Sequence, residues 1–353
     1  MNNAIREYFP GSNTPKGFYS YYDQILHSDE ADRIIILKGG PGTGKSTFMR
    51  RVASHLDTLG YETELLHCSS DPDSLDGVCA RAIGFLIVDG TSPHIIDAKF
   101  PGAIEQIINL GEYWNADKIK ENKQNIMRTS KNISEYFKNS YEYLAAAKTL
   151  QERTDYEFDK LLDDNEINKI TEDIKREFSL YPLCIKTASE RKAFLCAITP
   201  YGKIEYTDSF SKNAKKVYKI KADCASHSSH LLHAFKELFL KSGYDVRTFY
   251  SSMSPDVMLE HLYVPEIDVF FTTKNKPNSF VTEEITLSAN LKDKNISLDI
   301  YSDLEMYNLL IKRATTSIAN AKHLHDELEA MYVPFMNFGE IESLCDSVIM
   351  SIK

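Results

Sequence analysis

The chain contains the same sequence pattern twice. A shift of 183 residues brings Gly60-Tyr61-Glu62 onto Gly243-Tyr244-Asp245. Further matches follow without a gap at the same shift: Lys38 with Lys221, Ser69 with Ser252, Pro72 with Pro255, and Asp73 with Asp256. Because the matches keep their order and spacing, we interpret the chain as a tandem duplication, with one copy at about 1–186 and the other at about 187–353. Such a chain is expected to fold as two similar units.

Each copy combines strand and helix patterns in the same order. In the first copy a β-branched run at 33–37 precedes an expected helix at 45–59, and apolar runs follow at 62–67 and 83–88. Strands that alternate with helices predict a mainly parallel sheet with crossover helices. We therefore expect an α/β fold with sheet regions at about 1–114 and 191–300.

A long helical stretch follows each expected sheet region, at about 115–186 and 302–353. Ile119, Ile126 and Ile133 recur every seven residues. In the second copy, steps of four and three relate Leu310, Ala314, Ser317, Ala321, Leu324, Leu328 and Met331. This spacing is typical of a helix-packing seam. We expect helical hairpins that pack on each other or on the sheets. The alternative is a coiled coil that binds a protein partner or dimerises.

The first copy carries a phosphate-binding motif. Its residues match G-x-x-x-x-G-K-[ST] and read Gly39-Gly40-Pro41-Gly42-Thr43-Gly44-Lys45-Ser46. Glycines let the backbone wrap closely round a phosphate, and the following helix adds its N-terminal N–H donors. Lys45 is expected to reach the β- and γ-phosphates, and the Ser46 hydroxyl to bind Mg²⁺. We predict that this loop, continued by Thr47, binds ATP.

A carboxylate for the metal is expected at the end of a second apolar strand. Phe85-Leu86-Ile87-Val88-Asp89 fits this description, so Asp89 is the predicted partner of Mg²⁺. No glutamate follows Asp89 directly, where many ATPases place the residue that activates water. Asp71 and Asp76, on the loop after the preceding strand, are candidates for that catalytic role, because loops at the carboxyl ends of strands face the ligand in α/β sheets. His94 is a further candidate, as a sensor of the γ-phosphate. A capped turn that opens a helix is the alternative reading of the loop.

The second copy has lost the motif. Ala222 replaces the first glycine, His227 the last glycine and Ser228 the lysine, while Thr273 replaces Asp89. We interpret this region as a pseudo-site without nucleotide chemistry. By the same shift, Asp71 corresponds to Ser254 and Asp76 to Leu259, which links both aspartates to the working site. Cys224, His227, His230 and His233 recur every third residue. We interpret them as the result of sequence divergence in a loop that no longer binds nucleotide, with a metal site as the alternative.

Charge and cysteine content restrict the function further. A net charge of −10 argues against a general nucleic-acid or membrane-surface binder. The six cysteines form no C-x-x-C pair, and no apolar run approaches the length needed to span a bilayer. We expect a cytoplasmic protein with reduced thiols and no membrane partner.

These motifs also resemble a known family. The phosphate-binding loop, Thr14-Pro15-Lys16-Gly17, the loop at 69–76 and the segment at 88–94 resemble a bacterial family of tandem P-loop ATPase-like proteins of unassigned function. The resemblance implies a P-loop NTPase fold and a nucleotide ligand. The second half of that family usually keeps a glycine-rich loop, which Ala222, His227 and Ser228 depart from here.

Three functions are compatible with these features. The first is an Mg²⁺-dependent ATPase with one active site in the first half. The second is a kinase that passes the γ-phosphoryl group to a nucleotide or small metabolite, with Asp71 or Asp76 as the base and the helical region as a lid. The third is a non-catalytic scaffold that ATP orders and that grips a protein partner through its helices. A GTPase is disfavoured because no N-K-x-D signature is present.

Overall fold

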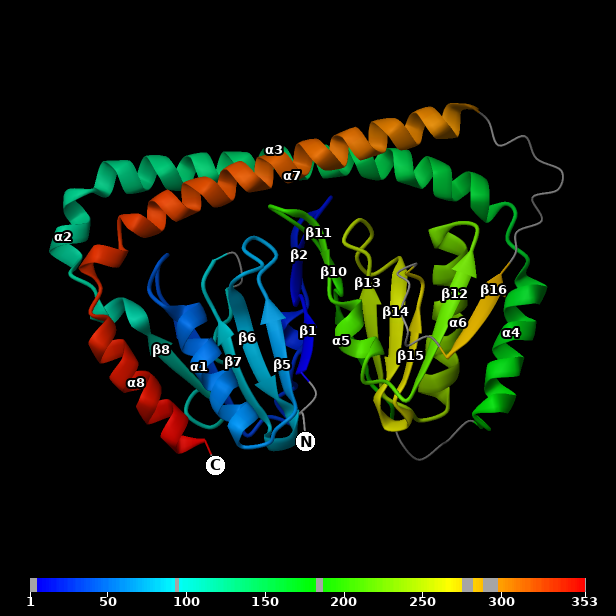
Figure 1. Ribbon diagram of the computed structural model, residues 1–353, viewed down its shortest axis with the longest axis horizontal. Helices are drawn as coiled ribbons and strands as arrows, with labels where there is room; N and C mark the ends of the chain where they lie inside the picture. Colours follow the sequence, from blue (N-terminus) through cyan, green and yellow to red (C-terminus); the bar gives the residue numbers. More distant parts are fainter. Residues whose placement is uncertain (1–4, 93–94, 182–186, 275–281, 288–297, 353) are drawn as a thin grey trace.

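Two six-stranded sheets stand side by side beneath two long helices (Figure 1). The structure is a computed structural model that describes residues 5–92, 95–181, 187–274, 282–287 and 298–352 of the 353-residue chain. Both sheets are mostly parallel and carry helices, so the predicted α/β fold with two similar units is confirmed at this level.

The first sheet belongs to the N-terminal half. Its order is β1 (Ile5–Tyr8), β5 (Thr63–His67), β6 (Leu75–Ala80), β7 (Phe85–Asp89), β4 (Arg33–Lys38) and β8 (Glu105–Asn109). Only β6 runs antiparallel to its neighbours in this sheet. The helix α1 (Lys45–Thr58) joins β4 to β5, and a separate hairpin is formed by β2 (Gly11–Thr14) and β3 (Gly17–Ser20). Short turns of helix are η1 (Tyr22–Gln24), η2 (Arg81–Ile83) and η3 (Leu110–Tyr113).

The second sheet repeats this topology. Its order is β16 (Glu283–Leu287), β12 (Lys216–Ala222), β15 (Val269–Thr272), β14 (Leu259–Val264), β13 (Val246–Tyr250) and β9 (Glu190–Ala193). The counterparts of the hairpin and of α1 are β10 (Cys196–Thr199) with β11 (Gly202–Glu205), and α6 (Ala225–Lys241). Two short helical elements, α5 (Thr207–Ser211) and η4 (Pro265–Ile267), complete this half.

Burial explains why these segments fold as they do. The run Ile34–Leu37 of β4 is buried throughout, because α1 and α8 cover one face of the sheet and residues 22–26, together with residues of the second half, cover the other. In α1 the buried side chains are Phe48, Met49, Val52 and Leu56, which form one stripe with helical spacing. The expected strands at 62–67 and 83–88 are β5 and β7. The strand β6 was not predicted: residues 69–76 were interpreted as a loop that faces the ligand, with a capped turn that opens a helix as the alternative.

The helical regions do not form the predicted hairpins. Instead, α3 (Lys123–Asp159) crosses from the first sheet to the second, and α7 (Leu298–Ala330) returns beside it in the opposite direction (Figure 1). With 37 residues, α3 is about 55 Å long at 1.5 Å per residue, which is enough to bridge both halves. The apolar seam expected in α7 therefore packs against α3 of the same chain. Leu144 and Ala147 of α3 contact Ala314 and Ile318 of α7 there.

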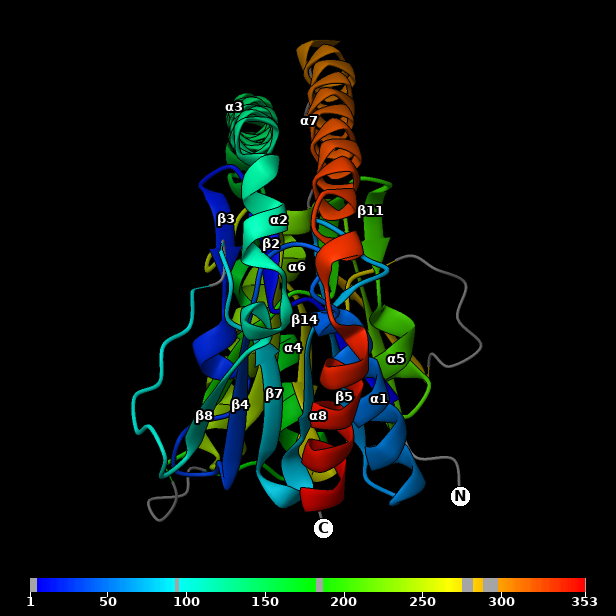
Figure 2. The same ribbon diagram turned by 90° about the vertical axis from the view of Figure 1, so that its left-hand side faces the viewer.

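The short helices at the ends of the long ones are exchanged between the halves. After α3, the helix α4 (Asp164–Glu177) packs on α6 of the second half. After α7 and the turn η6 (Val333–Phe335), the helix α8 (Phe338–Ser351) packs on α1 of the first half (Figure 1, Figure 2). The remaining short helix, α2 (Ala116–Glu121), precedes α3. Each sheet domain is thus completed by a helix from the other copy.

We predict that the core of the first half depends on α8. Ile341 is 5% exposed and joins a cluster with residues of α1 and the first sheet. Replacing Ile341 with alanine should lower the free energy of unfolding by about 2–4 kcal/mol through lost burial and cavity formation. Met350 of the same helix is 75% exposed, so Met350→Ala should change it by less than about 0.5 kcal/mol. Chemical denaturation measures both, and equal effects would show that α8 does not complete this core.

The two halves meet across corresponding residues. Phe9 and Phe194 exchange two backbone hydrogen bonds of 2.9 and 3.0 Å. Nearby, the Asn13 amide donates to the Ile198 carbonyl oxygen at 2.8 Å. The carboxylate of Glu64, on β5, lies 2.7 Å from the guanidinium of Arg247 on β13. Because corresponding positions face each other, the copies are related by a local pseudo-two-fold axis.

Glu64 is the centre of a buried charge cluster at this interface. Its side chain is 4% exposed and also accepts hydrogen bonds from Arg81 at 2.6 Å and from the Tyr8 hydroxyl at 2.7 Å. Burial by itself would raise the pKa of Glu64, but Arg247 and Arg81 outweigh burial and hold that pKa well below its usual value. The carboxylate is therefore ionised at neutral pH and neutralises the arginines around it.

Membrane-spanning helices and disulfide bonds were not expected from the sequence. Within the described ranges, none of the helices combines the length and the apolar character that crossing a membrane requires. The cysteines that the structure describes, Cys68, Cys79, Cys196, Cys224 and Cys345, all carry free thiols. Cys184 lies outside the described residues.

Candidate functional site

The segment between β4 and α1 forms a tight loop that ends in a helix N-terminus. Gly42 has a φ of 68° and Gly44 a φ of 85°, left-handed values that glycine adopts without strain. The Thr43 hydroxyl donates to the Gly40 carbonyl oxygen at 2.9 Å and closes the turn. The helix α1 then begins at Lys45, so its unpaired N–H groups and positive dipole end lie at the loop. This is the backbone arrangement that anions favour.

Lys45 turns back over the loop. Its ammonium donates to the carbonyl oxygens of Gly39 and Gly40 at 3.1 and 3.0 Å, and it lies 3.6 Å from the Asp89 carboxylate. Both side chains are mostly buried, at 13% and 12% exposure. The structure therefore brings together the predicted lysine and the predicted metal carboxylate.

Asp89 lies at the end of β7, opposite a second predicted residue. Its other oxygen accepts from the backbone N–H and hydroxyl of Thr91 at 2.8 and 2.5 Å, which fixes its orientation. The antiparallel register pairs Gly77 with Val88, so Asp76 on β6 faces Asp89 across the ladder. Asp76 is buried and accepts from the Tyr22 hydroxyl at 2.7 Å. Tyr22 was not found by sequence reasoning, since no motif marks it.

The remaining predicted residues are placed differently. The Ser46 hydroxyl accepts from the Leu75 N–H at 3.0 Å, and Ser229 does the same for Leu259 in the second half at 2.9 Å. This contact belongs to the scaffold of both copies and leaves Ser46 a lone pair for a metal. Asp71 accepts from the Ser74 hydroxyl at 2.8 Å and lies on the surface of its loop. His94 lies outside the described residues.

The structure of the second half corrects one of the residue correspondences expected from the repeat. Its loop leads into α6 with His227 fully buried and its Nε2 2.8 Å from the Phe158 carbonyl oxygen of α3. In the first half the corresponding residue is Gly44, where an added side chain would lie 3.6 Å from the ring of Phe338. The counterpart of Asp76 is Glu260 rather than Leu259, because β14 begins one residue later relative to β6. Glu260 pairs with Lys274 at 3.3 Å. An acidic residue at this position is therefore common to both copies and does not mark the working site.

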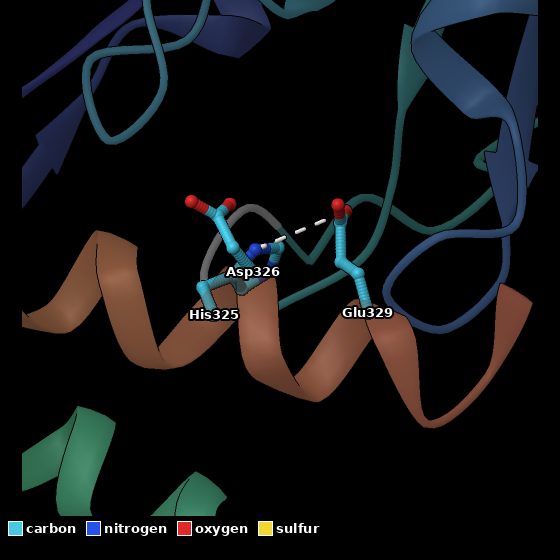
Figure 3. Close-up of side chains that lie close together, drawn as sticks. All are labelled: His325, Asp326 and Glu329. Carbon is cyan, nitrogen blue, oxygen red and sulfur yellow. Dashed lines mark ion pairs between the residues drawn. The ribbon is translucent and has the colours of Figure 1, made fainter.

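The histidine stripe of α6 does not converge. His230 lies 3.8 Å from Asp159 on α3, and His233 contacts the Val257 carbonyl oxygen at 2.9 Å. With His227 directed to Phe158, the three rings have separate partners. Among the described residues, a cluster with metal-ligand geometry occurs instead on α7, at His325, Asp326 and Glu329 (Figure 3).

Residues of the second half cover the loop of the first. The Gly42 N–H donates to the Glu329 carboxylate of α7 at 3.1 Å. A side chain added at Gly42 would lie 2.7 Å from a methyl group of Val333. One added at Gly40 would lie 3.6 Å from the ring of Tyr332 and 3.2 Å from that of Trp114, a residue of the first half. The ring of Tyr332 is 5.9 Å from that of Trp114. Sequence reasoning missed this cover, because the seam of α7 identifies its apolar face but not what its polar face meets.

The same face of α7 reaches Asp71. Lys322 lies 3.7 Å from the Asp71 carboxylate and 2.5 Å from Asp326, one turn further along the helix. Burial would lower the pKa of Lys322, but Asp326 and Asp71 raise it above its ordinary value, so the side chain carries a positive charge. The loop and the helix are therefore joined by charge as well as by packing.

An open groove of about 700 Å³ lies beside this cover, between segments that belong to the two sequence copies. It is lined on one side by residues 112–116 and on the other by residues 334–337 and Glu340. Backbone hydrogen bonds join its walls, from Asn115 to Phe335 at 2.9 Å and from Asn337 to Tyr113 at 2.8 Å. The groove is therefore built by both copies.

Comparison with known proteins gives no match to a protein-family model, to a curated protein or to a solved structure.

Proposed function

We propose that the chain is an ATP-binding protein with one Mg²⁺-dependent site in its first half, and that it hydrolyses ATP there. The observation that carries this proposal is the convergence of Lys45, Asp89 and the N-terminus of α1 on one loop. A phosphate needs N–H donors and a cation, and its metal needs a carboxylate. The second half lacks the lysine and the carboxylate and is proposed to be a pseudo-site.

The residues have separate roles in this proposal. Lys45 leaves the carbonyl oxygens of the loop and pairs with the β- and γ-phosphates. The donor set fits Mg²⁺, because Ser46 and Asp89 offer the hard oxygen ligands that this ion prefers. When bound there, the ion neutralises charge on the phosphates. Asp76, opposite Asp89, is proposed to orient water, whereas Asp71 is held by Ser74 and faces Lys322.

A nucleotide-gated scaffold is the second candidate. It is favoured by the cover of α7 on the loop, because a nucleotide bound there acts directly on a helix that spans both halves. The two candidates share the binding site and differ in turnover. Tight ATP binding without ADP formation would support the scaffold.

Metal dependence tests the proposal. ADP formation from ATP should require Mg²⁺ and stop when EDTA removes it. Asp89→Asn should lower kcat by roughly 10²-fold, since the metal loses an anionic ligand. Asp97→Asn is the matched control, because Asp97 lies just beyond β7 with its side chain 83% exposed, and it should leave kcat unchanged. Turnover that is insensitive to both EDTA and Asp89→Asn would contradict the proposed metal site.

A further inference from the structure

The position expected for a phosphate is taken by a carboxylate of the chain itself. Glu329, near the end of α7, accepts a hydrogen bond of 3.1 Å from the Gly42 N–H, inside the loop that carries the phosphate-binding motif. Figure 3 shows Glu329 projecting from α7 beside His325 and Asp326. A carboxylate and a phosphate both offer anionic oxygens to backbone N–H donors. Glu329 therefore stands in for a phosphate oxygen.

We infer that Glu329 is an internal competitor of the nucleotide, and that binding of the triphosphate displaces the end of α7 from the loop. This inference rests on the proposed function and adds its regulation. We call residues 322–333 the latch. The nucleotide site is then shared: the first half supplies the cradle, and the second half supplies the group that closes it.

Three contacts hold the latch closed. Glu329 binds Gly42, Val333 covers Gly42, and Lys322 pairs with Asp71. A phosphate bound by the Gly42 N–H would meet the negative charge of Glu329, while Val333 lies against the Cα of the same residue. The two anions exclude each other. The apparent affinity for nucleotide therefore equals the affinity of the open form multiplied by the fraction of molecules whose latch is open.

The chain beyond the latch is anchored independently. The backbone bonds between Asn115 and Phe335 and between Asn337 and Tyr113 fix the turn that follows α7. The helix α8 is held on α1 by its apolar face and by the Arg51–Asp346 pair at 2.5 Å. Opening of the latch thus moves the end of α7 and the residues up to Val333, while Phe335, Asn337 and the core of the first half stay in place.

The chain contains its own reporter for this movement. Trp114 is the single tryptophan of the sequence and lies between the loop and the latch, against Gly40 and Tyr332. When Tyr332 moves away, the environment of the Trp114 indole ring changes. Fluorescence of Trp114 therefore reports the latch, while equilibrium dialysis reports nucleotide binding separately.

The test compares Glu329→Ala with Glu327→Ala in the full chain. Glu327 is an exposed carboxylate two residues away on the same helix, and its ion-pair partner within the described part of the chain is His323. Glu329→Ala should bind Mg-ATP roughly three- to tenfold more tightly, since one charge-assisted contact to a half-exposed carboxylate is removed. Without nucleotide, its Trp114 spectrum should already lie towards that of ATP-bound wild type. Glu327→Ala should match wild type in both measurements, and Glu329→Gln should fall between, as it keeps an acceptor without the charge.

The outcomes separate the latch from the proposed function. Equal or weaker ATP binding by Glu329→Ala, with normal binding by wild type, would overturn the latch and leave the nucleotide site standing. A Trp114 spectrum that does not change with ATP in wild type would overturn the displacement of α7. If neither wild type nor Glu329→Ala binds ATP in dialysis, the proposed function fails and the latch fails with it.

Discussion

Lys45→Ala is expected to reduce ATP turnover by roughly 10²–10³-fold, the usual effect of removing one group that stabilises developing charge. In the free protein its ammonium is held by the carbonyl oxygens of Gly39 and Gly40 and by Asp89, all within 3.6 Å. The Lys45 ammonium therefore already lies at the loop, and it can exchange these oxygens for those of the phosphates. The measurement is ADP formation at saturating Mg-ATP, with dialysis to give the affinity.

The control for this prediction is a lysine of the same half without a place in the loop. Lys99→Ala removes the charge of an exposed side chain and should leave turnover and affinity at the wild-type level. Thermal denaturation of both variants checks that the fold is retained. If Lys45→Ala binds and hydrolyses ATP as wild type does, the loop at 39–47 is not a phosphate site.

The second large effect is expected at the interface of the halves. Glu64→Gln should lower the free energy of unfolding by about 3–5 kcal/mol at pH 7, because it leaves the buried charges of Arg247 and Arg81 without a counter-ion. Glu142→Gln removes a carboxylate that is 67% exposed on α3, and it should change stability by less than about 0.5 kcal/mol. Chemical denaturation distinguishes the two. A small effect of Glu64→Gln would mean that the arginines reach solvent.

The same residue predicts how stability depends on pH. Glu64 has a folded-state pKa below its unfolded value of about 4.3, so its contribution is present above that pH. The contribution is lost as the pH falls from there towards the folded-state pKa. The difference in unfolding free energy between wild type and Glu64→Gln should therefore shrink on acidification below about pH 4. A difference that stays constant from pH 7 to pH 3 would contradict the assigned role.

Local pattern was sufficient for several elements. The local sequence pattern alone predicts four elements: the buried run of β4, the apolar stripe of α1, and the apolar runs of β5 and β7. The repeat predicted two similar units, and the two sheets have the same strand topology. The loop and its lysine were located from spacing alone, and the structure places Lys45 beside Asp89.

Other features were out of reach of local pattern. The strand β6 begins Leu75-Asp76-Gly77, which is a poor strand sequence, and it forms because β5 and β7 offer open edges on both sides. The alignment of Asp76 with Leu259 was wrong. The loop before β14 is one residue longer than the loop before β6, so a constant shift pairs the residues of these strands incorrectly.

By itself the sequence determined the α/β class, the duplication and the composition of the loop at 39–47, because each depends on residues close together in the chain. Only the tertiary structure decided that α4 and α8 are exchanged between the halves, that Glu64 faces Arg247 and that Glu329 reaches Gly42. The physical reason is that an amphipathic helix specifies which of its faces is buried but not its partner. That choice is made by the length of α3 and α7, which carries each terminal helix past its own sheet to the other one.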